Sequence, residues 1–123
     1  KQAAGADFAI TQLFFEADEY LGFVERSRAA GVTIPILPGI MPVLSASRLA
    51  RIVEITDLPT PTALAGALAA AGDKDAQREV GLNHAVELTR AVVAGGAPGV
   101  HLYAFNEHET VLEVLRRAGV LAR

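Results

Sequence analysis

Apolar residues follow two different periods along this chain, and their alternation predicts its elements. Residues 8–15 form an almost unbroken run of apolar and β-branched residues that contains one amide side chain, Gln12. Such a run predicts a strand buried on both faces of a parallel sheet. Residues 32–37 and 100–105 predict a second and a third strand. Pro35 in the second run lacks a backbone N–H to donate to a neighbouring strand. Its nitrogen is therefore expected to face a gap in the sheet or an irregular strand pairing.

Apolar residues at helical spacing follow each of the first two strands. The first helix is predicted to begin near Asp18, which suits an N-cap, and to end at Gly31. The segment 38–42 is rich in proline and glycine and is expected to form a rigid turn. The next helix is expected to be capped by Ser45 or Ser47.

Three more helices are predicted in the second half of the chain. One covers residues 62–71, and a long one starts at Asp73 or Asp75. The inward stripe predicted for the long helix is Leu82, Ala85, Val86, Thr89 and Val93. The last helix is expected to be capped by Asn106 and to end at Gly119.

The order of these elements is typical of parallel βα units with right-handed crossovers. Three strands bury little apolar surface, whereas a TIM (β/α)8 barrel has eight strands in roughly 250 residues. We therefore expect an α/β fold in which residues 1–123 are the C-terminal portion, about three βα units, of a single barrel domain. The N-terminal part is then expected outside this chain, in agreement with Lys1 in place of an initiating Met. A small three-layer α/β domain is the alternative.

Composition narrows the classes of function. Hydrophobic residues make up 51% and charged residues 20%, as in a soluble globular protein. Eleven Lys and Arg against fourteen Asp and Glu give a net charge of −3, which argues against a nucleic-acid partner. The chain has no cysteine, its three histidines lack metal-site spacing, and no apolar run is long enough to span a membrane. We expect a cytoplasmic protein without a metal.

In a βα barrel, ligands bind at the carboxyl ends of the strands. This rule points to Gln12, to the segment 38–42 and to residues 103–107. An amide within an apolar strand either makes a structural hydrogen bond or binds a ligand as donor and acceptor at once.

The third strand carries a second candidate group. His101, Tyr103 and Phe105 share one strand face by the two-residue period. They form either a packed core cluster or a surface that orients a planar ligand.

Four stretches, in the same order and at compatible spacing, resemble the methylenetetrahydrofolate reductase family. They are Ile10 to Phe15, Pro38 to Pro42, Asp75 with Arg78 and Gly81 ahead of Ala85, and His101-x-Tyr103-x-x-Asn106. The resemblance extends over residues 1 to about 120 and covers the C-terminal part of the family's barrel.

The resemblance implies a flavoenzyme of folate one-carbon metabolism and methionine supply. Members pass a hydride from NADH or NADPH to FAD, and then to 5,10-methylenetetrahydrofolate, which becomes 5-methyltetrahydrofolate. The family's catalytic acid comes from an early strand, so no catalytic residue is expected in this chain, which would be inactive alone. Family members form homo-oligomers, and the same is expected of the parent protein.

The resemblance also assigns individual residues. Gln12 matches the family's folate-binding glutamine, and Tyr103 matches a tyrosine on the last strand. Lys1 falls where the family has a lysine near the FAD phosphates, and Ile10 matches a position close to FAD.

Three further substrate-binding positions depart from the family's pattern. Arg48 and Ile52 stand where better-known members have a glutamine and an aromatic residue, and Glu107 stands in place of an arginine. Arg48 is expected to hydrogen-bond or to meet the folate's glutamate tail, and Ile52 to offer an apolar contact without stacking. These departures motivate one alternative, a divergent barrel paralogue with a different ligand. A non-catalytic half-barrel that needs a partner is a separate alternative.

Overall fold

The computed structural model describes residues 8–103 and 108–119, which fall into two compact units. Among these residues, the sheet unit consists of 8–41 and 88–103, and the helical unit of 42–87 and 108–119. Helix α4, Lys74–Ala94, contributes its first part to the helical unit and its last turns to the sheet unit. In the described part of the chain, no helix is long and apolar enough to cross a membrane.

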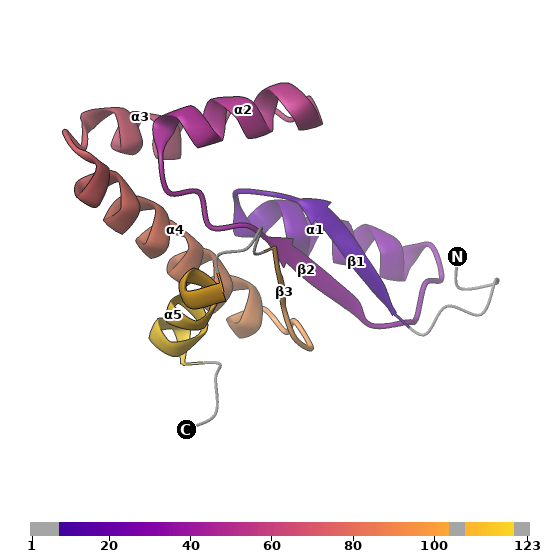
Figure 1. Cartoon of the computed structure of the whole chain (residues 1–123). Helices are drawn as coiled ribbons and strands as arrows, with labels where there is room; N and C mark the ends of the chain where they lie inside the picture. The colour runs from indigo at the N-terminus through magenta and orange to yellow at the C-terminus, as the bar shows by residue number, and fades with distance from the viewer. Residues whose placement is uncertain (1–7, 104–107, 120–123) are drawn as a thin grey trace. The chain divides into compact units, whose positions relative to one another are not determined.

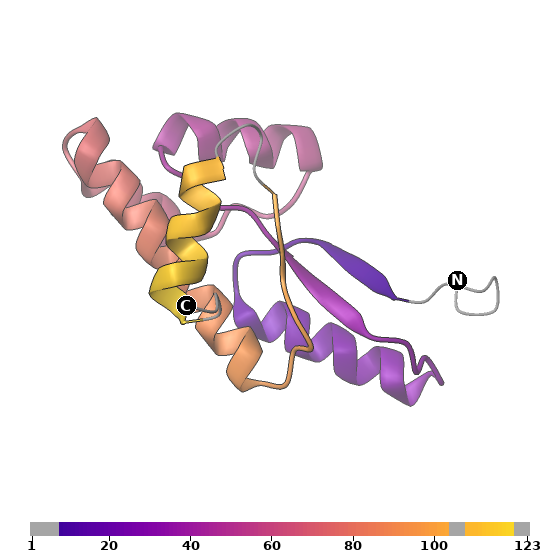
Figure 2. The ribbon, with the colours of Figure 1, turned by 60° about the horizontal axis from the view of Figure 1, so that its bottom comes forward.

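The sheet unit contains three parallel strands in the order β1-β2-β3. Their bounds are Ala9–Leu13 for β1, Ile36–Ile40 for β2 and His101–Leu102 for β3. Helix α1, Ala17–Ala29, connects β1 to β2 and lies along one face of these strands (Figures 1 and 2). The prediction of parallel strands connected by helices is therefore confirmed.

Strand β2 lies further along the chain than predicted. It includes Pro38 and Gly39, which were expected in a turn, and excludes residues 32–35. Pairing begins where Ala9 N–H donates to the Pro35 carbonyl, 2.9 Å away. The register then shifts between Ile10 and Leu13, so that β1 has one extra residue opposite Pro38. Because proline has no N–H to donate, a strand accommodates it best at such an irregularity.

The expectation that the first strand is buried on both faces is wrong. Phe8 is 53% exposed and Ile10 41% exposed, and Gln12 is exposed as well. Residues 8, 10 and 12 alternate along the chain and therefore lie on one face, so one face of the strand is exposed and only the other is covered. Strand β3 is also shorter than predicted, and residues 104–105 of the predicted third strand lie outside the described residues.

Two local interactions fix α1. Its N-cap is Glu16 rather than the predicted Asp18, because the Glu19 carboxylate accepts the N–H groups of Glu16 and Phe15 at 3.0 and 3.1 Å. On the buried side, the Tyr20 hydroxyl donates to the Ile36 carbonyl at 2.6 Å. The Glu19 bonds fix the start of α1 against the segment that precedes it, and the Tyr20 bond attaches the first turn of α1 to β2.

The helical unit contains α2, Ala46–Thr56, α3, Thr62–Ala70, the first part of α4, and α5, His108–Ala118. The predicted cap Ser45 is confirmed, since its hydroxyl accepts the Arg48 N–H at 3.1 Å. Asp73 is confirmed at the start of α4, where its carboxylate accepts the Ala76 N–H at 2.8 Å. The predicted cap Asn106 lies outside the described residues.

The predicted stripe of α4 is buried except at its last position. Leu82, Ala85, Val86 and Thr89 are buried, but Val93 is 41% exposed. In the last turns the buried positions are Leu88 and Val92, so Val93 lies at the margin of the buried face. A buried face that shifts along a long helix is not visible in the apolar periodicity alone.

Replacing isoleucine by alanine at a buried and at an exposed position tests this assignment of the core. Ile40 in β2 is 1% exposed, so Ile40→Ala is expected to lower the free energy of unfolding by about 2–5 kcal/mol. Ile55 in α2 is 66% exposed, and Ile55→Ala is expected to stay within about 0.5 kcal/mol of the wild type. Urea unfolding measures both, and equal losses would contradict the assignment.

The buried hydroxyl of Tyr20 predicts a pH dependence at the alkaline end. Burial raises the pKa of Tyr20 above its ordinary value of 10.0, and the charge of Arg28 opposes this only in part. The stabilisation by the protonated hydroxyl is thus complete below the unfolded-state pKa and is lost as the pH rises through the folded-state pKa.

We expect Tyr20→Phe to be less stable than the wild type at neutral pH by about 0.5–1.5 kcal/mol, the net value of one hydrogen bond. The difference should shrink above about pH 10, where the wild type begins to lose this stabilisation. Urea unfolding at a series of pH values checks the result. A difference that stays constant across the alkaline range would contradict a buried, protonated hydroxyl.

Candidate functional site

The candidate site of the sheet unit lies at the carboxyl ends of its three strands. Because the strands are parallel, these ends meet at one edge of the sheet (Figure 1). Gln12 lies at the end of β1, Gly39 near the end of β2, and Tyr103 directly after β3. The strand pairing therefore gathers three of the segments that the sequence points to.

Thr11 and Gly39 form the junction between β1 and β2. The Gly39 N–H donates to the Thr11 hydroxyl at 2.9 Å, so a side chain takes the place of a main-chain acceptor at the shifted register. Sequence reasoning missed Thr11. The sequence feature that could have indicated Thr11 is a hydroxyl side chain immediately before Gln12. The strand that carries it pairs with the strand that contains Pro38 and Gly39.

Gly39 also provides the space in which the Tyr103 ring lies. A Cβ atom at residue 39 would be 2.6 Å from the Thr11 carbonyl oxygen and 3.0 Å from Cε2 of Tyr103. Real Cβ atoms do not approach other atoms so closely, so the arrangement requires glycine at this position. Sequence reasoning placed Gly39 in a turn and missed this role.

Tyr103 is held by its main chain and by a neighbouring ring as well. Its N–H donates to the Ile40 carbonyl at 2.9 Å, which extends the pairing of β3 by one residue. The His101 ring stands nearly perpendicular to the Tyr103 ring, with centroids 4.7 Å apart and an angle of 80°. Both side chains are half-buried, so part of this cluster stays accessible. Phe105, the third predicted member of this face, lies outside the described residues.

A cavity of about 400 Å³ opens beside β1 and brings Ile10 and Gln12 together. Helix α1 contributes Glu19, Phe23 and Arg26 to its wall. The Glu19 carboxylate is held in place by the two main-chain N–H groups that it accepts. Amide, carboxylate and guanidinium groups beside apolar side chains suit a ligand with a polar edge and an apolar face.

Two predicted site residues belong to the helical unit. Arg48 lies in the first turn of α2 and is exposed, and its N–H is held by the Ser45 hydroxyl. Ile52 follows one turn later and is only 7% exposed, so little of its side chain reaches the surface. The two remaining predictions, Lys1 and Glu107, lie outside the described residues.

The described side chains at the strand ends can bind and orient a ligand through hydrogen bonds and flat rings. Within residues 8–103 and 108–119, no group of three or more His, Asp and Glu side chains could hold a metal ion. The groups in place at the strand ends are an amide, a phenol and an imidazole, which supply hydrogen bonds and flat surfaces.

Parallel strands connected by helices define the class of this protein, an α/β protein, and its candidate site lies at the strand ends. A family model described as methylenetetrahydrofolate reductase matches residues 1–119. The chain belongs to the methylenetetrahydrofolate reductase family.

Curated relatives agree with this family. The chain is 38% identical over 119 residues to the probable methylenetetrahydrofolate reductase (NADPH) of Caenorhabditis elegans. This match covers 95% of the chain and 18% of the relative. It is 34% identical over 122 residues to methylenetetrahydrofolate reductase (NADH) 1 of Arabidopsis thaliana, covering 98% of the chain and 21% of the relative.

A bacterial relative matches over a larger share of its own length. The chain is 31% identical over 121 residues to the 5,10-methylenetetrahydrofolate reductase of Escherichia coli (strain K12). This match covers 98% of the chain and 41% of the relative. The chain thus spans less than half the length of each of these relatives.

Adding one methyl group at Gly39 tests the close packing at the strand ends. Gly39→Ala is expected to lower the free energy of unfolding by about 1–3 kcal/mol, because the new Cβ atom collides with the Thr11 carbonyl. Gly66, inside α3, has no heavy atom within 4 Å of an added Cβ. Gly66→Ala is therefore expected to be neutral or to stabilise by up to about 1 kcal/mol. Urea unfolding of the two variants compares them, and a neutral Gly39→Ala would refute the close approach.

Proposed function

We propose that this chain is part of a flavin-dependent oxidoreductase of folate metabolism. The reaction is the reduction of 5,10-methylenetetrahydrofolate to 5-methyltetrahydrofolate, with NADH or NADPH as the hydride donor. The observation that carries the proposal is the family match over residues 1–119. Relatives named for NADPH and for NADH support a nicotinamide donor, and the choice between the two is left to experiment.

The proposed architecture is a (β/α)8 barrel to which this chain contributes three βα units at its C-terminal side. The strand order supports this, because β1 pairs with β2 on one side only among the described residues and an unpaired strand edge favours the addition of a further strand. The relatives are longer than the chain and leave room for the remaining units. The proposal includes a cytoplasmic location, a homo-oligomeric parent protein, and neither nucleic acid nor membrane as a partner.

FAD would contact this chain at Ile10, with Lys1 near its phosphates. Ile10 fits such a contact, since its exposed apolar side chain lies in the same cavity as the Gln12 amide. When bound, FAD supplies the transfer of hydride from the nicotinamide to the folate. The acid that assists the folate's reduction would come from the rest of the parent protein.

The folate would be bound by residues at the strand ends. The Gln12 amide can donate and accept hydrogen bonds along the edge of a pterin ring. The Tyr103 ring, held in place by Gly39 and His101, offers a second oriented surface. Arg48, Ile52 and Glu107 are proposed around the remainder of the substrate, where the charge of Arg48 suits a carboxylate.

The experiment uses the full-length parent protein. We expect it to purify with a flavin absorbance that NADH or NADPH bleaches under anaerobic conditions and that 5,10-methylenetetrahydrofolate restores. A protein that purifies without flavin, and does not take up added FAD, would overturn the proposal.

Substituting Gln12 tests the folate contact within that protein. Gln12→Ala is expected to slow folate-dependent reoxidation at low folate by about three- to tenfold, which corresponds to the loss of one hydrogen bond. Flavin content and bleaching by NAD(P)H should be unchanged. Asn83→Ala, which removes an exposed amide from α4, serves as the matched control. If Gln12→Ala reoxidises as fast as this control does, the assignment of Gln12 is wrong.

A further inference from the structure

The first part of α4 makes a contact with the start of α2 that the proposed function does not use. The Gln77 side-chain oxygen accepts the Ala46 N–H at 2.8 Å. Ala46 is the first residue of α2, and an N–H in the first turn of a helix has no acceptor within its own helix. Ser45 satisfies the Arg48 N–H in the same turn, so one cap of α2 is local and the other comes from α4.

A second contact lies one helical turn further along α4. Gly81 is buried, and a Cβ atom there would be 1.9 Å from the Val43 carbonyl oxygen and 3.0 Å from Cα of Leu44. Main-chain atoms cannot rotate away as the end of a side chain can, so the segment before α2 rests directly on α4. Val43 itself is almost fully buried at 1% exposure.

The two contacts together fix the direction in which the chain enters α2. Gln77 and Gly81 are four residues apart, so they share one face of α4. Their partners, Ala46 and Val43, lie three residues apart along the segment that leads into α2. A segment that is attached at two points has a fixed position and a fixed direction.

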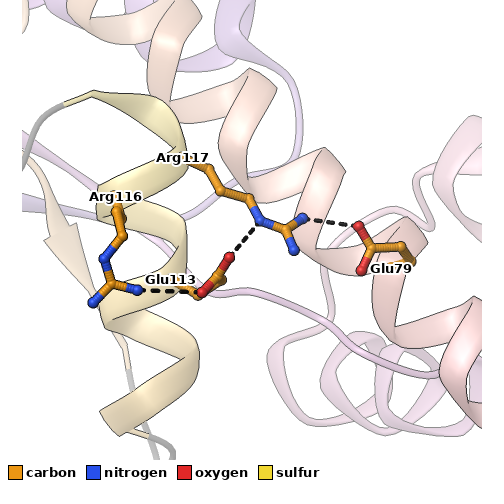
Figure 3. A network of polar contacts seen from close by, with 4 residues as sticks. All are labelled: Glu79, Glu113, Arg116 and Arg117. Atoms are coloured by element: carbon orange, nitrogen blue, oxygen red, sulfur yellow. Dashed lines mark hydrogen bonds and ion pairs between the residues drawn. The ribbon is translucent and has the colours of Figure 1, made fainter.

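Another residue of the same stretch attaches α5. The Arg117 guanidinium donates to the Glu79 carboxylate at 2.9 Å and, through Nε, to the Glu113 carboxylate at 2.7 Å (Figure 3). Arg116 adds an ion pair with Glu113 at 3.3 Å. The hydrogen bond from Arg117 lowers the pKa of Glu113, so this carboxylate keeps its charge to a lower pH than a free glutamate does. Residues 77–81 thus connect α4 with α2 and with α5 within the helical unit.

We propose that Gln77 and Gly81 are positioning residues for the substrate, and that they act by fixing the first turn of α2. Arg48 lies in that turn and is exposed, so the place where the turn is held sets the point from which its side chain extends. The chemical group that it orients is a carboxylate of the folate's tail. This inference rests on the proposed function, because it requires that Arg48 meets the substrate.

The test measures KM and kcat for 5,10-methylenetetrahydrofolate in the full-length protein. Gln77→Leu keeps the approximate size of the side chain and removes the acceptor for the Ala46 N–H. It is expected to raise KM by about three- to tenfold, the effect of one lost hydrogen bond, with little change in kcat or flavin content. Gln77→Glu retains an acceptor oxygen and should restore KM to near the wild-type value. Asn83→Leu is the matched control on the same helix.

A double substitution shows whether Gln77 acts through Arg48. If it does, adding Gln77→Leu to Arg48→Ala raises KM no further than Arg48→Ala does alone. Additive losses, an unchanged KM in Gln77→Leu, or a loss that Gln77→Glu does not rescue would each overturn the positioning role. A wild-type protein that fails to reduce the folate would instead overturn the proposed function.

Gly81→Ala provides an independent check of the second contact. Because the added Cβ atom would collide with main-chain atoms, this variant is expected either to raise KM as Gln77→Leu does or to lower the melting temperature markedly. Full activity with unchanged KM and melting temperature would show that α4 does not hold the segment before α2.

Discussion

The sheet unit depends on a strand that is paired on both sides and yet contains a proline. Strand β2 must form hydrogen bonds with β1 and with β3, but Pro38 offers no N–H to either. The difficulty is resolved next to the proline, where β1 carries one extra residue and the Thr11 hydroxyl accepts the Gly39 N–H. The same place forms the candidate site, since Gly39 leaves the space in which the Tyr103 ring lies.

The two units share one physical device, a glycine where main chains come too close for a side chain. Gly39 allows the close approach of main chains between β1 and β2, and Gly81 allows it between α4 and the segment before α2. Neither glycine has a positive φ, in contrast to Gly31 and Gly96, which end helices in the left-handed region. Glycine is therefore required at Gly39 and Gly81 for its lack of a side chain and not for its conformational freedom.

In the proposed function, the described residues would position the ligands and a bound cofactor would supply the reaction. Gln12 offers hydrogen bonds in both directions, and Tyr103 offers a flat ring whose orientation is set by its neighbours. Arg48 offers a charge whose place is set by the start of α2. Transfer of hydride is the property of a flavin, which needs geometry and surroundings from the protein more than a reactive side chain.

The sequence by itself determined the order and type of the elements and the family, and it narrowed two helix caps to Ser45 or Ser47 and to Asp73 or Asp75, because these depend on local spacing and on short motifs. It did not determine where β2 begins, because that depends on which residues of β1 face Pro38. Nor did it show that Gln12 is exposed or that Gln77 caps another helix. Burial and hydrogen-bond partners are decided by residues distant in sequence, and only the tertiary structure brings those residues together.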